Sequence, residues 1–338
     1  VNEQGLIETT SANLPRIDYS DSSTEPSLLL EPQSTNLFTY SNDFSQWSSL
    51  AGASVINNAL VSPDGSLNAD EFVFDGTNNG RIEKNISTTN GLVYTFSIYL
   101  KNKDIANPTQ VFIGNETNSE GGFVTITNEW QRFTNTQTVN ETNEYPRIRY
   151  DGIGSLYAYG AQFEQLSYAT SYIPTSGSTA TRLGETADNA GGAGVFNSEE
   201  GVLYAEIAAL TDGGSNRTIT LSNGSYDNSV RIQFYLNTNE IEMRIVVQGV
   251  IQAIQRVAIA NTLLFNKMAV KYKENDFQLW VNGSVLRFDT SGTVPASGTL
   301  SELSFDDGNG NGDFYGKTKN LKVFNYALTD EELQTLTT

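Results

Sequence analysis

The chain has 338 residues, of which 38% are hydrophobic and 17% are charged, and its formal net charge at pH 7 is −19. It contains no cysteine and no histidine, which excludes disulfides, thiol nucleophiles, Ser-His-Asp triads and zinc sites built from these residues. Because no basic cluster interrupts the acidic surplus, we expect neither a nucleic acid nor a membrane as a partner.

The composition predicts a two-domain, nearly all-β protein. The length exceeds what one ordinary sandwich needs and gives each of two domains enough residues for a core. Asn, Thr, Ser and Gly are abundant, a mixture that suits short strands joined by turns. No apolar run approaches the ~20 residues of a membrane helix. Val1 opens no signal peptide, and the sequence begins as if cut from a longer chain.

Residues 1–26 show no sustained period and contain two prolines, so we expect an N-terminal arm or the tail of a preceding module. A first domain is expected over residues 27–165. It opens with the short apolar strand "SLLLEP" and a turn-rich segment that ends at Trp47. Its clearest strand is "YTFSIYLK", residues 94–101, where alternation places Tyr99 on a polar face and Phe96 and Ile98 on the core face.

Further strands of this domain are expected at residues 109–115, 121–127, 129–139, 146–152 and 155–165. Residues 166–190 then lose all periodicity and hold Pro174 and many Ser and Thr, which predicts a connector. Flexible linkers are poor in large apolar residues, whereas this one contains Tyr168, Tyr172 and Ile173. We therefore expect an ordered connector whose three side chains pack against one or both domains and fix their relative orientation.

The second domain is expected over residues 191–338. Strand patterns fall at residues 201–210, 216–224, 229–237, 240–259, 266–275, 276–289, 300–307 and 320–328. The chain closes with a short helix, where Thr329 and Glu332 have the spacing of a capping box. Such a helix is long enough only to cover a sheet edge.

Two resemblances add to this pattern. Residues 190–338, in "GVLYAEIAAL", "NKMAVKYKENDFQLWVNG" and "NLKVFNYALTDEELQTL", resemble a concanavalin A-like or laminin G-like domain. The first half, in "NLFTYSNDFSQW", "YTFSIYLK", "EWQRFT" and "GAQFEQLSYATSYIPT", resembles the jelly-roll domains of bacteriophage tail-fibre and head-fibre proteins, which are similar to carbohydrate-binding modules. Together they predict two antiparallel β-sandwiches in series, a jelly roll and then a concanavalin A-like sandwich.

The phage resemblance implies a non-enzymatic fibre, spike or decoration protein on the virion surface. Proteins of this kind are commonly trimers that contact other virion proteins and host glycans or cell-surface polysaccharides. The alternative is the carbohydrate-binding portion of a secreted bacterial enzyme that degrades polysaccharides.

Concanavalin-like sandwiches also host glycosidases, which need two closely spaced carboxylates. Alternation places Glu240 and Glu242 on one strand face, but Arg244 follows them where a third carboxylate would stand. We interpret this stretch as a solvated strand face. Without histidine, a lyase would need a lone tyrosine base with a strongly lowered pKa. Hydrolysis and elimination are therefore disfavoured.

Sugar binding uses aromatic faces, with polar side chains to read the hydroxyl groups. Tyr99 and Trp280 are the best candidates, because each stands on the polar face of an expected strand. Trp47 is a candidate for a rim, and Tyr157 shares a face with Tyr159 and Phe163. For each aromatic residue the alternative is packing or an intersubunit contact.

The one metal-like stretch is "DDGNGNGD" at residues 306–313. Asp307, Asn309 and Asn311 reproduce the start of a calcium loop, but position twelve is Thr318 and not Glu, which excludes an intact EF-hand. A looser calcium site would use Asp307, Asn309, Asn311 and Asp313. The alternative is a Gly- and Asn-rich hairpin loop.

Overall fold

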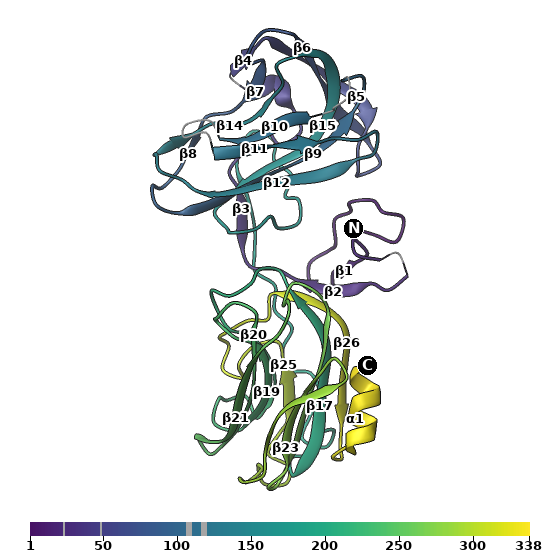
Figure 1. The fold of residues 1–338 in the computed structure, drawn as a ribbon, viewed down its shortest axis with the longest axis vertical. Helices are drawn as coiled ribbons and strands as arrows, with labels where there is room; N and C mark the ends of the chain where they lie inside the picture. The colour runs from purple at the N-terminus through teal and green to yellow at the C-terminus, as the bar shows by residue number, and fades with distance from the viewer. Residues whose placement is uncertain (23, 48, 106–109, 116–119) are drawn as a thin grey trace. The chain divides into compact units, whose positions relative to one another are not determined.

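The computed structural model describes residues 1–22, 24–47, 49–105, 110–115 and 120–338. Antiparallel sheets dominate this part of the chain, and α1 (Asp330–Thr337) is its one α-helix. The chain divides into two compact units, unit 1 with residues 1–9 and 33–184 and unit 2 with residues 10–32 and 185–338. The predicted all-β class with two antiparallel sandwiches is confirmed (Figure 1). None of the described helices has the length and apolar character needed to span a membrane.

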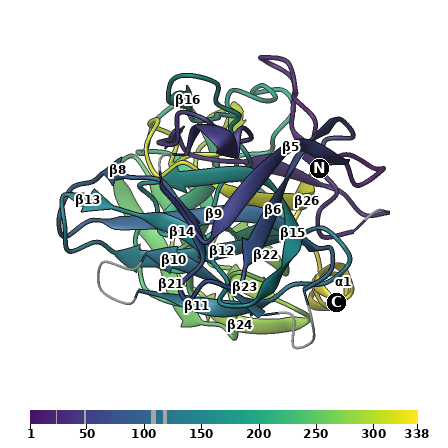
Figure 2. The same cartoon turned by 90° about the horizontal axis from the view of Figure 1, so that it is seen from above.

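Unit 1 contains two five-stranded sheets. The first has the order β12 (Gln131–Thr138), β9 (Val93–Asn102), β15 (Ile153–Glu164), β6 (Leu67–Asp75) and β5 (Ala53–Val61). The second has the order β11 (Glu120–Thr125), β10 (Gln110–Asn115), β14 (Pro146–Arg149), β7 (Arg81–Glu83) and β4 (Ser49–Ala51). Short pairs join β13 (Asn143–Glu144) to β8 (Ile86–Ser87) and β16 (Ala180–Arg182) to β3 (Ser34–Asn36), and η1 (Phe44–Gln46) is a 3-10 turn. Figure 2 shows these strands from above.

Strand β9 shows why the first sheet forms. Its alternate residues Phe96 and Ile98 are buried in the core of unit 1, whereas Tyr99 on the opposite face is half-buried. The expected strand at residues 109–115 corresponds to β10 at Gln110–Asn115, and residue 109 lies outside the described part of the chain. Alternation in the sequence therefore predicted both the strand and its core face.

A β-bulge in β15 changes which side chains share a face. Tyr159 pairs with Tyr99, but Gln162 pairs with Ser97, so the two residues between them in β15 stand opposite a single residue of β9. Phe163 consequently points into the core, and its expected placement on one face with Tyr157 and Tyr159 is wrong. The same shift turns Gln162 and Glu164 to the outer face.

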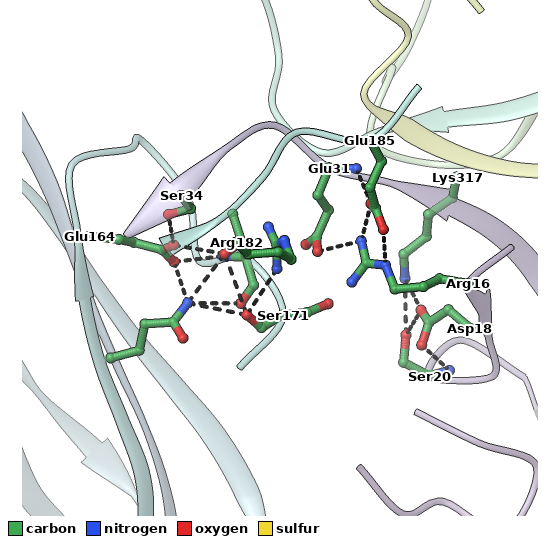
Figure 3. A network of polar contacts seen from close by, with 12 residues as sticks. Arg16, Asp18, Ser20, Glu31, Ser34, Glu164, Ser171, Arg182, Glu185 and Lys317 are labelled. Atoms are coloured by element: carbon green, nitrogen blue, oxygen red, sulfur yellow. Dashed lines mark hydrogen bonds and ion pairs between the residues drawn. The ribbon is translucent and has the colours of Figure 1, made fainter. Parts of the chain in front are cut away.

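The first part of the connector packs on that outer face. The carboxylate of Glu164, which is fully buried, accepts hydrogen bonds from Ser34 Oγ, Thr170 N and Thr170 Oγ1 at 2.5–2.7 Å (Figure 3). Gln162 Oε1 accepts from the N–H of Ile173 at 2.7 Å, and Ile173 is buried. Tyr172 Oη contacts Ser41 Oγ at 2.6 Å. Residues 170–173 thus belong to unit 1, while their expected role in orienting the two domains stays a prediction.

Unit 2 contains a seven-stranded and a five-stranded sheet. The first has the order β1 (Ile17–Asp18), β2 (Ser27–Leu30), β26 (Gly316–Phe324), β17 (Glu200–Ala209), β22 (Asn266–Lys273), β23 (Phe277–Val281) and β24 (Ser284–Asp289). The second has the order β21 (Val250–Ala258), β20 (Glu240–Val247), β19 (Ser229–Phe234), β18 (Arg217–Ser222) and β25 (Glu302–Ser304). Buried aliphatic and aromatic side chains from both sheets form one core cluster.

The N-terminal segment differs from its expected place. Strand β2, expected to open the first domain, pairs with β26 of unit 2, and Leu30 lies in the core of that unit. Arg16 holds the segment there, since its guanidinium donates hydrogen bonds to Glu31 and Glu185 (Figure 3). Lys317 makes ion pairs with Asp18 and Asp21. The described residues between 10 and 26 are therefore part of a folded unit and not a free arm, because strands β1 and β2 extend a sheet of unit 2.

Helix α1 begins at the predicted capping box. Thr329 accepts from the N–H of Glu332, and the Glu332 side chain accepts from the N–H of Thr329. Leu333 packs with Trp280 and Tyr204, which point away from the main core of unit 2. The helix thus covers a face of the seven-stranded sheet, and the expectation that it would cover an edge is wrong.

Candidate functional site

The five-stranded sheet of unit 2 has an apolar face and a polar face. Ile219, Ile232 and Met243 lie in the core on the apolar face. One row of the polar face reads, from β25 to β21, Ser304, Thr220, Arg231, Arg244 and Ile254. The adjacent row reads Thr218, Gln233, Glu242 and Arg256. Directly opposite residues on antiparallel strands are ~5 Å apart at Cβ, so each row brings its side chains into contact range.

The register of the β20–β21 hairpin decides which residue faces Glu242. Its turn residues Gln248 and Gly249 both have positive φ, 50° and 77°, as a two-residue type I′ turn requires. A one-residue β-bulge then shifts the pairing, and Glu242 lies opposite Arg256. Without the bulge Glu242 would oppose Gln255. The bulge therefore places a cation beside the carboxylate.

Glu242 is the centre of the polar face. Its carboxylate is 0% exposed and accepts hydrogen bonds from Gln233 Nε2 at 3.0 Å, Arg244 Nε at 2.8 Å and Arg256 Nε. Glu240, by contrast, accepts from Asn237 and does not join Glu242. The expectation of a solvated strand face is wrong, because cross-strand neighbours enclose the carboxylate. We call Glu242 with Arg231, Arg244 and Arg256 the arginine cluster.

Two tyrosine rings fix the guanidinium planes of the arginine cluster. The Tyr226 ring centroid lies 3.7 Å from the guanidinium carbon of Arg231, and Tyr226 Oη accepts a hydrogen bond from Arg244 Nη1. The Tyr235 ring centroid lies 3.9 Å from the guanidinium carbon of Arg256. Burial lowers the pKa of Arg231, against the opposing charges of Tyr226 and Asp307.

The side of the cluster facing β18 is covered by the loop at residues 306–313. Thr220 Oγ1 donates to the carbonyl oxygen of Asp306 at 2.6 Å. Gly308 has φ +85°, and a Cβ built there would lie 3.0 Å from both Cβ and Oγ of Ser222. Glycine is thus required by close approach to the sheet. The opposite side, where β21 is the edge strand, leaves the Arg256 side chain 39% exposed.

This loop is also the predicted calcium site. Asp307 Oδ1 accepts from the N–H groups of Asn309 at 2.9 Å and Asn311 at 3.2 Å, and Asp313 Oδ2 accepts from Tyr315 Oη at 2.8 Å. In the described part of the chain, no group of three or more His, Cys, Asp or Glu side chains is placed to hold a metal ion. The loop supplies its own donors to these oxygens, and the calcium site stays a prediction.

Two of the predicted sugar-binding residues share the outer face of unit 1. Tyr99 and Tyr157 are both half-buried, on adjacent strands β9 and β15. The Arg132 guanidinium carbon lies 5.4 Å from the centroid of the Tyr99 ring, and Lys103 Nζ lies 5.9 Å from that of Tyr157. Their role in sugar binding stays a prediction.

The two predicted tryptophans lie elsewhere. Trp47 is 3% exposed, stacks on Phe38 at 4.6 Å and donates its Nε1–H to the carbonyl of Tyr40, so its expected place on a rim is wrong. Trp280 is 6% exposed because α1 covers its strand face. Trp280 also lines an open hollow of about 360 Å³ with Ser284 and residues of α1, but its low exposure leaves little of the indole ring for stacking.

The arginine cluster offers fixed hydrogen-bond donors. Within the described residues, Arg256 Nη1 and Nη2 and Arg244 Nη2 have no hydrogen-bond partner, whereas both oxygens of Glu242 are occupied. Three hydrogen-bond donors occupy most of the lone pairs of this carboxylate, which leaves it poorly placed to activate water or attack a sugar. The arrangement therefore suits binding of acceptor groups.

Sequence reasoning found Glu242 and Arg244 but not their partners. Arg256 lies in an expected strand of twenty residues, 240–259, that is in fact the hairpin β20–β21. The signal that marks the turn is Gln-Gly at residues 248–249. Arg231 joins through its cross-strand pairing with Arg244, which no local pattern encodes, and Tyr226 joins from the turn before β19 through its contact with Arg231.

No protein-family model matches the chain, and no curated protein matches it. Among solved structures it is similar to the CBM40 of Ruminococcus gnavus IT-sialidase bound to α2,3-sialyllactose, with 17% identity, coverage of 42% of this chain and 84% of that chain, and a TM-score of 0.36. It is also similar to domain 4 of AbnA, a GH43 extracellular arabinanase from Geobacillus stearothermophilus in complex with arabinotriose, with 11% identity, coverage of 48% and 73%, and a TM-score of 0.36. A third is a heptameric SAP-like pentraxin from Limulus polyphemus, with 10% identity, coverage of 45% and 74%, and a TM-score of 0.35. These likenesses are too distant to carry an argument about function.

Proposed function

We propose that the protein is a non-catalytic glycan-binding protein and that unit 2 binds a saccharide at the arginine cluster. One observation supports this most strongly: Glu242, the Tyr226 hydroxyl group and the Tyr235 ring hold Arg244 and Arg256 in fixed orientations with donors left over. Donors that are already ordered lose little freedom when they bind sugar hydroxyls. Tyr235 and the exposed β21 edge supply apolar surface beside them.

A glycan titration tests this proposal. The whole chain is screened on a glycan array, and its best ligand is titrated by calorimetry against wild type and Arg256→Ala. We expect Arg256→Ala to weaken binding at least tenfold. The control is Arg287→Ala on β24, an exposed arginine outside the polar face, which we expect to leave the affinity unchanged. No signal for any glycan would refute the proposed function.

Unit 1 offers a second proposed contact through Tyr99 and Tyr157. Their half-buried rings lie beside Arg132 and Lys103, a combination that provides both apolar and donor groups. Tyr157→Ala in the same titration tests this contact. An affinity equal to that of wild type would leave unit 2 as the sole proposed site.

We propose further that the binding serves adhesion on a phage virion, on the ground of the sequence resemblance to phage fibre proteins. The alternative is the binding portion of a secreted polysaccharide-degrading enzyme. Light scattering coupled to gel filtration separates them: a stable trimer supports the fibre, and a strict monomer with glycan affinity supports the binding module.

A further inference from the structure

The Arg256 guanidinium is held by Glu242 at Nε and by the Tyr235 ring on its face, whereas its Nη1 and Nη2 end is open. Its Nε donates to Glu242 Oε2, and its plane lies on the Tyr235 ring with 3.9 Å from guanidinium carbon to ring centroid. Neither Nη1 nor Nη2 has a hydrogen-bond partner among the described residues, and the side chain is 39% exposed. The end of the guanidinium that carries both Nη atoms is thus a fixed two-pronged donor.

Arg244 stands beside Arg256 on the same carboxylate. Its Nε donates to Glu242 Oε1 at 2.8 Å and its Nη1 donates to Tyr226 Oη, which leaves Nη2. The hydrogen bonds and the charge of Glu242 raise the pKa of Arg244 despite its burial. One buried carboxylate is therefore shared by two guanidinium groups, and neither guanidinium makes a second ion pair with any of the described residues.

Other charges on this face lie to either side. The negative charge of Asp307 favours the charged form of Arg231 and so opposes the lowering of its pKa by burial. The Glu240 carboxylate accepts a hydrogen bond from Asn237. Next to Arg244, in the same cross-strand row, Ile254 is 36% exposed on the edge strand β21. The centre of the face thus combines a two-pronged cationic donor with a small apolar surface.

We propose that Arg256 and Arg244 bind the anionic group of an acidic saccharide, either a carboxylate or a sulfate, whose sugar ring rests on Ile254. Guanidinium groups pair with planar or tetrahedral oxyanions through two parallel hydrogen bonds. A neutral sugar hydroxyl would use one of these donors and leave the excess charge unbalanced. This inference rests on the proposed function and names the class of ligand for that site.

The experiment compares matched probes on the whole chain by calorimetry. The probes are tetragalacturonate, its fully methyl-esterified form, a sulfated galactan tetrasaccharide and the neutral galactan tetrasaccharide, with 3′-sialyllactose and lactose as a second carboxylate pair. We expect at least tenfold tighter binding of an acidic member than of its neutral counterpart. Preference among uronate, sialyl and sulfated probes identifies which anion is bound.

Two variants test whether the preference for acidic saccharides depends on the arginine cluster. Arg256→Ala should remove the acid preference, and Arg256→Lys should weaken acid binding at least fivefold although it keeps the charge, because lysine lacks the two-pronged geometry. Arg287→Ala is the control, and a melting curve for each variant verifies folding. Equal binding of acidic and neutral probes would overturn this inference and leave the proposed function standing. Failure of all probes, together with a blank glycan array, would overturn both.

Discussion

Glu242 shows how one buried carboxylate organises a strand face. It is fully buried and bonded to Gln233, Arg244 and Arg256, so it replaces water for two guanidinium groups at once. Removing one member of a buried ion pair costs more than the pair itself contributes, because a desolvated charge is left without a partner. The position therefore matters for stability as well as for orientation of the donors.

We expect Glu242→Gln to lower the free energy of unfolding by about 3 kcal/mol, since one guanidinium loses its acceptor and the charge between the arginines disappears. Urea unfolding followed by circular dichroism measures the change. The matched control is Glu240→Gln on the same strand, whose side chain accepts an exposed hydrogen bond from Asn237 and which should change stability by less than ~0.5 kcal/mol. A neutral or stabilising Glu242→Gln would contradict the account of the cluster.

Asp70 in unit 1 is a buried carboxyl with an unusual titration. Burial raises its pKa to about 6, the nearby Asp43 charge adds to the shift, and the N–H groups of Asn58 and Phe44 oppose it. An unfolded aspartate has a pKa near ~4, so the native state holds the proton more tightly. Stability from this group is full below pH ~4 and declines as the pH rises to about 6.

A carboxyl-detected NMR titration should therefore place the Asp70 midpoint near pH 6, and Asp43→Asn should lower it. A midpoint at or below pH ~4, the value of a solvated aspartate, would show that solvent reaches this carboxyl.

At the scale of elements, the loop at residues 306–313 is defined by contact with strand β18. Gly308 and Gly310 both have positive φ, +85° and +73°. A Cβ added at Gly308 would meet sheet atoms at 3.0 Å, whereas a Cβ added at Gly310 would meet nothing within 4 Å. Comparing substitutions at Gly308 and Gly310 therefore separates the cost of the backbone conformation from the cost of the packing clash.

We expect Gly310→Ala to cost about 1 kcal/mol, the strain of a left-handed alanine, and Gly308→Ala to cost about 1–3 kcal/mol more because the methyl group meets Ser222. Thermal melting of both variants measures the difference. Equal costs would mean that the loop moves off the sheet freely.

The same loop allows a prediction about calcium. Because Asp307 Oδ1 and Asp313 Oδ2 already accept hydrogen bonds from within the loop, we expect EDTA and millimolar calcium to leave the melting temperature unchanged. A calcium-dependent rise would show that the ion replaces these donors and would support the predicted site.

Bulges mark where sequence reasoning stops at this scale. Alternation predicted β9 and its core face, and the spacing of Thr329 and Glu332 predicted the helix cap. One extra residue in β15 moved Phe163 into the core, and one in the β20–β21 hairpin brought Arg256 to Glu242. A bulge depends on packing with the neighbouring strand, so the local pattern does not reveal it.

At the scale of the whole molecule, composition and period predicted two β-sandwiches, but not how the chain divides between them. Strand β2 reads as a plain apolar strand, and only its pairing with β26 assigns it to unit 2. Similarly, nothing local distinguishes Trp47, which stacks on Phe38 in the core, from a tryptophan on a rim. In both cases, the assignment of β2 to unit 2 and the burial of Trp47, the outcome depends on contacts with residues distant in the sequence or outside the local pattern.

The division of the chain predicts how fragments behave. A fragment of residues 185–338 lacks β1 and β2, which leaves the edge of β26 unpaired and Glu185 without Arg16. We expect it to melt at least ~5 °C below a version in which residues 10–32 are joined to its N-terminus, and a synthetic peptide of residues 10–32 should recover part of the loss. Equal melting temperatures would show that the segment does not stabilise unit 2.

The contacts of Arg16 with Glu31 and Glu185 show how the two pieces of unit 2 are joined, and this bears on how the gene can recombine. Unit 2 is encoded in two pieces with residues 33–184 between them, so no single crossover can transfer it to another gene as one cassette. The two pieces nevertheless meet: Glu185 N donates to the carbonyl of Glu31 at 3.0 Å, and Glu31 N donates to Glu185 Oε2 at 2.8 Å. A single in-frame deletion between these points would rejoin them, which makes the inserted block the part that recombination can most easily remove or exchange.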